Sequence, residues 1–136
     1  MKLRILLPGS DLETEFPRVL PLFEQLPATP EYEPRLLLDL ARRGLAQIGV
    51  ISGEDGEPVA ALAMEMIYYP RITALNIIAM AGAGLAEAVR DCMPSVQEFA
   101  EAAGAVRIEA LCGDAMTRAL ARHGFKKQYN QLVFEV

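Results

Sequence analysis

The sequence predicts an α/β (α+β) fold in which a mixed, mainly antiparallel central sheet is flanked by helices, in the order βααβββαβαβ. Short apolar runs bounded by glycine and proline alternate with segments in which apolar residues recur at helical spacing. Three strand-like runs follow one another without a helix between them, which favours an antiparallel meander at the centre. The length of 136 residues fits a single domain over residues 1–136.

The N-terminal part predicts a strand and then an imperfect helix. Lys2 to Leu7 is a short apolar run that a Pro-Gly pair stops. Ser10 and Glu13 form an S-x-x-E capping box, which is typical of a helix start. Pro17 and Pro21 lie inside the apolar helical pattern that follows, and because each lacks an amide donor they predict a kink or a split.

The central part predicts a second helix and the meander. The helix runs from Pro34, a residue suited to a first turn, to a stop at Gly44. The runs Gln47–Ser52 and Pro58–Tyr69 flank a loop with an Asp-Gly pair and are expected to pair antiparallel. Arg71–Ala81 is the third strand of the meander.

The C-terminal part alternates helices and strands. Apolar spacing from Leu85 to Ala103 is helical, with Pro94 marking a kink or a break into two pieces. Ala105–Leu111 alternates as a strand, and Ala115–His123 is a short helix. Lys127–Val136 is predicted as the last strand of the sheet.

Composition argues against several classes of partner. A net charge of −5 gives no cationic surface for a nucleic acid or an anionic membrane, so neither is expected as a partner. Cys92 and Cys112 have no CxxC spacing and no nearby histidine, so no metal site is expected. Both are interpreted as buried, reduced thiols rather than as a disulfide or a nucleophile. The apolar run at the start is too short for a signal peptide, and a cytoplasmic location is expected.

Two glycines lie between the third strand of the meander and the next helix, in the segment Gly82-Ala83-Gly84. Free amides and the positive end of a helix dipole favour an anion, and glycine lets a phosphate approach the backbone. The same two glycines also suit a tight turn after a buried strand. The sequence leaves both interpretations open.

The element order, the Gly82-Ala83-Gly84 turn and the helix-Gly-Phe ending Ala119–Phe125 together resemble the GNAT (GCN5-related N-acetyltransferase) superfamily. The segment Ala63–Pro70, followed by Ala74–Ile77, is also similar to GNAT-like proteins of tailed phages and prophages. This resemblance implies acetyl-CoA as the cofactor, with its pyrophosphate on the turn after the strand. The residues at that position are Met80, Ala81, Gly82, Ala83 and Gly84.

The sequence departs from the family pattern at two positions. Ala79 stands where active members carry a glutamine or arginine, and no Lys or Arg lies between Arg71 and Arg90 to replace it. Leu120 stands where many members carry the tyrosine that protonates the leaving thiolate. Tyr129 and His123 are the candidates for that acid, although His123 also suits a helix C-terminal cap.

For the base, Glu65 is the candidate because it interrupts an otherwise apolar run. The alternative is simple alternation, in which Ala61, Ala63 and Glu65 share a solvated strand face, and Glu109 has the same two interpretations. Asn76 is a second polar interruption, suited either to orienting the ligand or to a strand bulge.

The expected function is therefore acyl-CoA-dependent N-acyltransfer, from acetyl-CoA to a small-molecule or protein amine acceptor. The alternative is a GNAT-fold protein that has lost catalysis and serves as a structural or interaction component, encoded by a phage and located in the virion. A ligand sensor with a weakened coenzyme site lies between the two. A homo-oligomer, or a phage or host protein partner, is compatible with each of these hypotheses.

Overall fold

The computed structural model describes all residues, 1–136. Its elements are β1 (Lys2–Ile5), α1 (Ser10–Phe23), the 3₁₀ helix η1 (Pro34–Leu36), α2 (Leu37–Arg42), β2 (Gln47–Ser52), β3 (Pro58–Tyr68), β4 (Thr73–Gly82), α3 (Leu85–Ala102), β5 (Arg107–Ala110) and α4 (Asp114–Arg122). The five strands form one sheet in the order β1-β2-β3-β4-β5, in which only the β4–β5 pair is parallel. The predicted mixed, mainly antiparallel α/β fold is confirmed.

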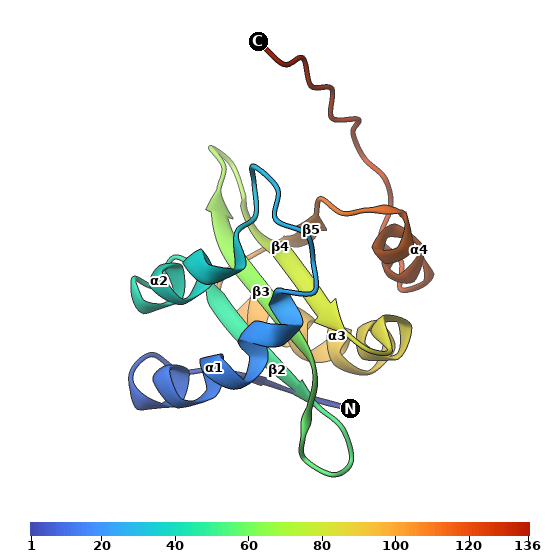
Figure 1. Cartoon of the computed structure of the whole chain (residues 1–136). Helices are drawn as coiled ribbons and strands as arrows, with labels where there is room; N and C mark the ends of the chain where they lie inside the picture. The colour runs from blue at the N-terminus through green and yellow to red at the C-terminus, as the bar shows by residue number, and fades with distance from the viewer.

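The sheet lies between two layers of helices (Figure 1). The apolar cluster on one face joins it to α3 and α4, and the cluster on the other face joins it to α1 and α2. On the α1 face the central strand β3 presents only Ala61 and Ala63, which are fully buried. These small side chains let the aromatic rings of Phe16 and Phe23, 6.3 Å apart, lie close to the sheet.

A β-bulge in β4 changes which face its side chains occupy. Ile77 is opposite Met64 and Ala79 is opposite Ala63, so Ile78 has no partner on β3. Ile77 therefore belongs to the cluster under α3, while Ala79 belongs to the cluster under α1. One extra residue thus redirects the rest of the strand, as bulges near sites commonly do.

The prolines do not break their helices. α1 runs without interruption through Pro17 and Pro21, and α3 runs through Pro94, so the predicted split of either helix is wrong. All three prolines lie on the exposed side, where the carbonyls that lose a partner can reach water. In α1 the buried stripe of Leu12, Phe16, Val19 and Phe23 holds the helix on the sheet.

The predicted capping box does not form. Ser10 is the first residue of α1 rather than its cap, and no side chain caps the helix. Glu13 is drawn away because Arg42 of α2 donates from Nε to its Oε2 at 2.8 Å. Asp11 instead accepts the backbone N–H of Leu7 at 2.8 Å, which ties the first turn to the preceding loop.

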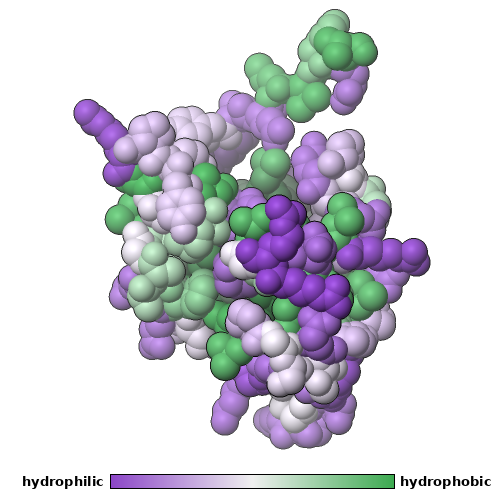
Figure 2. Space-filling model, turned by 90° about the vertical axis from the view of Figure 1, so that its left-hand side faces the viewer, coloured by the Kyte–Doolittle hydropathy of each residue, from purple (hydrophilic) through white to green (hydrophobic).

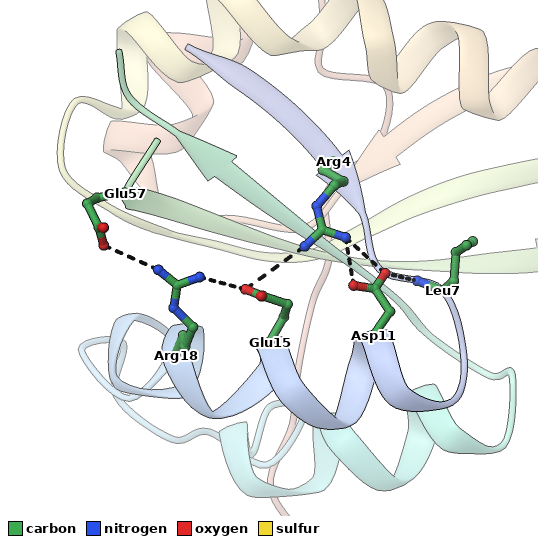
Figure 3. Close-up of polar contacts among 6 residues, drawn as sticks. All are labelled: Arg4, Leu7, Asp11, Glu15, Arg18 and Glu57. Carbon is green, nitrogen blue, oxygen red and sulfur yellow. Dashed lines mark hydrogen bonds and ion pairs between the residues drawn. The ribbon is translucent and has the colours of Figure 1, made fainter. Parts of the chain in front are cut away.

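A chain of ion pairs fixes α1 against the strands (Figure 3). Arg4 of β1 contacts Asp11 at 2.7 Å and Glu15 at 3.9 Å. Arg18 contacts Glu15 at 2.9 Å and, in the β2–β3 loop, Glu57 at 3.2 Å. Such exposed pairs contribute little each, but together they set the position of the helix along the sheet.

The last expected strand, Lys127–Val136, is wrong for the isolated chain. Phe125 donates its N–H to Leu120 O at 3.1 Å, and no backbone hydrogen bond involves any later residue. The segment leaves the body as an extended tail (Figure 1) and so meets no strand of its own chain. No helix has the length and apolar character needed to cross a membrane.

Candidate functional site

A cleft opens where β4 and β5 separate. The two strands pair from Ala74↔Arg107 to Ile77↔Ala110, after which β5 ends and β4 continues to Gly82. The edge of β4 from Ile78 onward therefore has no strand beside it. A cavity of about 260 Å³ lies there, lined by Leu26, Pro27, Thr29 and Tyr32 of the α1–η1 loop, by residues 77–80 and 110–113, and by Met116 of α4.

A second hollow, of about 370 Å³, lies on the outer side of the same loop, among residues such as Glu24, Glu33 and Arg35. It contacts no strand of the sheet, and its lining is mostly exposed loop. The cleft between β4 and β5 combines an apolar lining with unpaired backbone, which is the usual character of a small-molecule site. It is therefore the candidate functional site.

The turn from β4 into α3 divides the predicted glycine segment into two roles. A Cβ on Gly82 would come within 2.4 Å of Val59 O, so this glycine is required by close packing on β3. Ala83 donates its N–H to the same Val59 O at 3.1 Å and is not free for a ligand. Gly84, with φ 65°, precedes α3 without a side-chain cap, and its N–H makes no backbone hydrogen bond. The free donors thus begin at Gly84 and continue into the first helical turn.

Met80 and Ala81 place their side chains in the two cores rather than in solvent. Met80 belongs to the cluster under α3 and also lines the cleft, while Ala81 packs under α1. Ala79 is buried under α1 beside the cleft. Of these residues, the cleft-side groups that remain for a ligand are the backbone edge and the Met80 side chain.

Glu65, Asn76 and Glu109 form a polar row across three strands, just before the cleft opens. Asn76 is opposite Glu65 on one side and Glu109 on the other. Its Nδ2 donates to Glu65 Oε1 at 3.1 Å. Arg107 Nε donates to Glu109 Oε2 at 3.1 Å, and Tyr69 OH also donates to Glu109. This last bond raises the pKa of Tyr69, because ionisation would remove the proton that the phenol donates to the Glu109 carboxylate.

The solvated-face interpretation of Glu65 is wrong for the residues before it. Ala61 and Ala63, on the same side of β3, are fully buried under α1. Glu65 itself is half-buried, at the end of the part of β3 that α1 covers. Asn76 does not occupy the bulge, which lies at Ile78, but it directly precedes the point where the strands separate.

The structure does not bring Tyr129 or His123 to this row. Tyr129 lies in the C-terminal tail, is 77% exposed, and its hydroxyl contacts only the side chain of Gln128, at 3.2 Å. His123 is the C-terminal cap of α4, and its side chain makes no hydrogen bond. Sequence spacing could not show how far Tyr129 lies from Glu65, because the position of Tyr129 depends on where the segment after α4 runs.

Cys112 is the residue that sequence reasoning placed wrongly. It is exposed, lines the cleft, and its Sγ is 3.4 Å from Thr117 Oγ1. Cys92 is buried in α3 as predicted, and burial raises the pKa of its thiol. The signal for Cys112 was its place directly before Gly113-Asp114, where the strand has already ended.

Comparisons with known proteins agree with this architecture. The sequence matches no protein-family model and is significantly similar to no curated protein sequence. Among solved structures, the chain superposes over 100% of its length on all of a ribosomal-protein-alanine N-acetyltransferase from Brucella melitensis, with a TM-score of 0.75 and 10% identity. The chain has the GNAT fold.

Two further GNAT structures match over nearly their whole length. An acetyltransferase from Trypanosoma brucei gives a TM-score of 0.69 at 14% identity, with 98% of each chain covered. A glucosamine-6-phosphate N-acetyltransferase from Arabidopsis thaliana gives 0.66 at 13% identity, over 98% of this chain and 97% of that one. At such identities the likeness concerns the fold.

Within the GNAT fold of this chain, the two departures from the family pattern are structural. Leu120, at the position of the expected tyrosine, is buried in the core under α3. Ala79 is buried as well, and a longer side chain there would have to enter the cleft or displace α1. Tyr32 closes the opposite wall: its OH donates to Phe23 O at 2.8 Å, and burial raises its pKa to about 12.

Proposed function

We propose that the protein is an acyl-CoA-dependent N-acyltransferase that transfers an acetyl group from acetyl-CoA to an amine. The observation that carries the proposal is the unpaired edge of β4, from Ile78 to Gly82, which borders the cleft and leads to the start of α3. Acetyltransferases are among the solved structures with this fold, and their names support the reaction class.

The backbone of this region fits such a cofactor. An unpaired strand edge binds an extended, amide-containing chain as a neighbouring strand would. Gly84 and the first turn of α3 offer amides without a side-chain cap, at the positive end of an 18-residue helix. No Lys or Arg lies in the turn itself, so the diphosphate would depend on main-chain donors. When bound, acetyl-CoA supplies the acetyl group as an activated thioester.

The polar row supplies the acceptor side of the site. Glu65 accepts the proton that the amine releases as its nitrogen bonds to the acetyl carbon and displaces the coenzyme A thiolate, which takes its proton from water. Asn76 keeps one oxygen of the Glu65 carboxylate oriented by its hydrogen bond. Glu65 and Glu109 on one side of the sheet favour a cationic or amine-bearing acceptor. Neither Leu120 nor Tyr129 can protonate the leaving sulfur in the isolated chain. Leu120 is an apolar side chain buried in the core, and Tyr129 lies in the exposed tail.

The two cysteines allow a direct test of cofactor binding. Cys112 lines the cleft and Cys92 is buried, so iodoacetamide should label only Cys112 in the native protein. Saturating acetyl-CoA is expected to slow that labelling at least tenfold, whereas a small thiol-free amine should not. The buried Cys92 serves as the internal control, since its labelling reports unfolding. Unchanged labelling of Cys112, with no rise in Tm, would falsify the cofactor site.

Turnover is tested separately by following the release of coenzyme A thiol with a panel of primary amines. The Glu65→Gln variant should lose the release while retaining the protection of Cys112. Release that is equal in the two proteins would remove Glu65 from the mechanism.

A second candidate function is a GNAT-fold interaction protein without catalysis. It is favoured by one observation, namely that Leu120 fills the core where an acid would be needed. Protection of Cys112 without turnover for any amine would support a coenzyme-binding sensor. Absence of both would support an interaction role.

A further inference from the structure

The C-terminal tail, residues 125–136, exposes apolar side chains that a folded monomer would normally bury. Leu132 is 92% exposed and Phe134 88% exposed, and Val133 and Val136 are exposed too. From residue 126 onward no backbone group of the tail makes a backbone hydrogen bond. Figure 2 shows the apolar end of the tail as a green group separated from the body. Beyond Phe125, the backbone of this segment has no partner and its apolar side chains are exposed.

The pattern of the tail is that of a strand. Leu132, Phe134 and Val136 alternate with Val133 and Glu135, which gives one apolar face and one mixed face. Valine and phenylalanine favour strands in general, and the segment contains no glycine or proline after Gly124 that would turn it back. The tail therefore has the sequence of a strand and lacks only a sheet.

The sheet has a free edge at β5, where a strand could be added. This strand is last in the order and pairs only with β4, so its outer edge is free. Two exposed apolar residues flank β5 along the chain: Val106 directly precedes it and Leu111 directly follows it. The other free edge, β1, carries the exposed charges of Lys2 and Arg4, which discourage pairing. An added strand would therefore be expected at β5 rather than at β1.

We propose that the tail of one chain pairs with the β5 edge of a second copy, and that the exchange is reciprocal in a two-fold dimer. The tail departs from its own body after α4 (Figure 1), and at roughly 3.3 Å per residue it reaches about 40 Å. β5 has only four residues, and the tail makes no backbone hydrogen bond to the β5 of its own chain. In the exchanged dimer the apolar half of each tail lies on the partner's β5.

Reciprocal exchange also closes the assembly. Each chain contributes one tail and one β5 edge, so a two-fold dimer uses both tails and both β5 edges and leaves neither to recruit a third copy. Leu111, directly after β5, lines the cleft, so the partner's tail would lie along the outer wall of the candidate site. The exchange does not depend on the proposed chemistry.

Mass and amide exchange on the full chain test the proposal together. Sedimentation at micromolar concentration should give twice the chain mass of 14.9 kDa. Amides 132–136 and 107–111 should both be protected from hydrogen exchange, and both should lose protection as dilution halves the mass. A monomer with a tail protected at every concentration would mean pairing within one chain, and a monomer with an unprotected tail would mean no pairing; either result overturns the exchange.

Variants separate this interface from any other. Leu132→Asp combined with Phe134→Asp should yield a monomer that keeps the far-UV signal of its helices, because residues 126–136 make no backbone hydrogen bond to their own body. The matched control is Leu45→Asp, an exposed leucine between α2 and β2, which should remain dimeric. A double variant that is still a dimer, or a dimer whose tail amides exchange freely, would place the interface elsewhere and reject the proposal.

Discussion

Asn76 donates from Nδ2 to Glu65 Oε1 at 3.1 Å, directly across the β3–β4 ladder. On its other side Asn76 is in register with Glu109 of β5. One amide thus lies between two carboxylates, one strand position before β4 and β5 separate. The pair connects the structural role of Asn76 to the chemistry proposed for Glu65, and it suggests the first experiment.

Replacing Glu65 by Gln should lower kcat by about 10²-fold or more, because the base that accepts the amine proton is lost. The KM for acetyl-CoA should stay unchanged, since Glu65 is not part of the β4 edge. Glu98→Gln, on the exposed side of α3, is the control and should be silent. If Glu109→Gln loses activity and Glu65→Gln does not, the base is Glu109.

Gly82→Ala should destabilise the protein more than Gly104→Ala. Both glycines have positive φ, 124° and 86°, so both variants suffer backbone strain of about 1 kcal/mol or more. Only at Gly82 does the new Cβ also meet backbone atoms, Val59 O at 2.4 Å and Ala60 Cα at 2.6 Å. Urea unfolding should show a further loss of about 1–3 kcal/mol for Gly82→Ala. Equal losses would mean that β3 moves aside without cost.

Deleting Ile78 should be tolerated far better than deleting Ala61. Ile77 is already opposite Met64 and Ala79 opposite Ala63, so the shortened β4 keeps both pairs and Ala79 and Ala81 stay on the α1 side. Ala61 lies in a regular part of β3, where losing one residue moves part of the strand to the other face of the sheet. The expected result is a cooperative unfolding transition with a measurable Tm for the Ile78 deletion and loss of that transition for the Ala61 deletion. Loss of the transition in both variants would show that the bulge residue is required.

The ion pair between Arg4 and Asp11 predicts a dependence of stability on pH. The Arg4 guanidinium, and then the Leu7 amide, hold the pKa of Asp11 below its ordinary value of 3.8. Because the folded-state pKa is the lower one, the ionised carboxylate stabilises the fold above about pH 4, and this contribution is lost as the pH falls through the folded-state value.

The measurement is Tm against pH for the unmodified protein and for Asp11→Asn. The difference in Tm should be constant near neutral pH and should shrink below about pH 4. Arg4→Gln should reproduce most of the effect, and the double variant should add little, because both residues act through one interaction. A difference that persists at low pH would assign the effect to packing instead.

Local rules predicted most elements of the fold from the sequence. Helical spacing and glycine stops located α2 and α4, and the Asp-Gly turn located the β2–β3 hairpin, in which Gly56 has φ 81°. Where prediction failed, a distant contact decided the outcome. Glu13 left the capping box for Arg42, 29 residues away, and the prolines stayed in their helices because burial of the opposite face outweighed the lost hydrogen bonds.

The candidate site was predictable in part. Two polar interruptions in apolar runs, Glu65 and Asn76, proved to be partners across the sheet. The bulge at Ile78 and the exposure of Cys112 depend on which strands pair and where they end. Strand pairing is decided by distant parts of the chain, so the residues next to Ile78 and Cys112 do not predict it. The tail segment had the alternation of a strand, but a strand also needs a neighbour, and periodicity says nothing about which molecule provides it.

The two small residues beneath α1 have a consequence for the shape of the cleft. Ala61 and Ala63 set how closely α1 approaches β3, and Tyr32 is fastened to the end of that helix through Phe23 O. A bulkier residue at either alanine would lift α1, and with it the loop that forms one wall of the cleft. The width of the cleft proposed for acetyl-CoA can therefore be tuned from beneath a helix, at positions that do not line it.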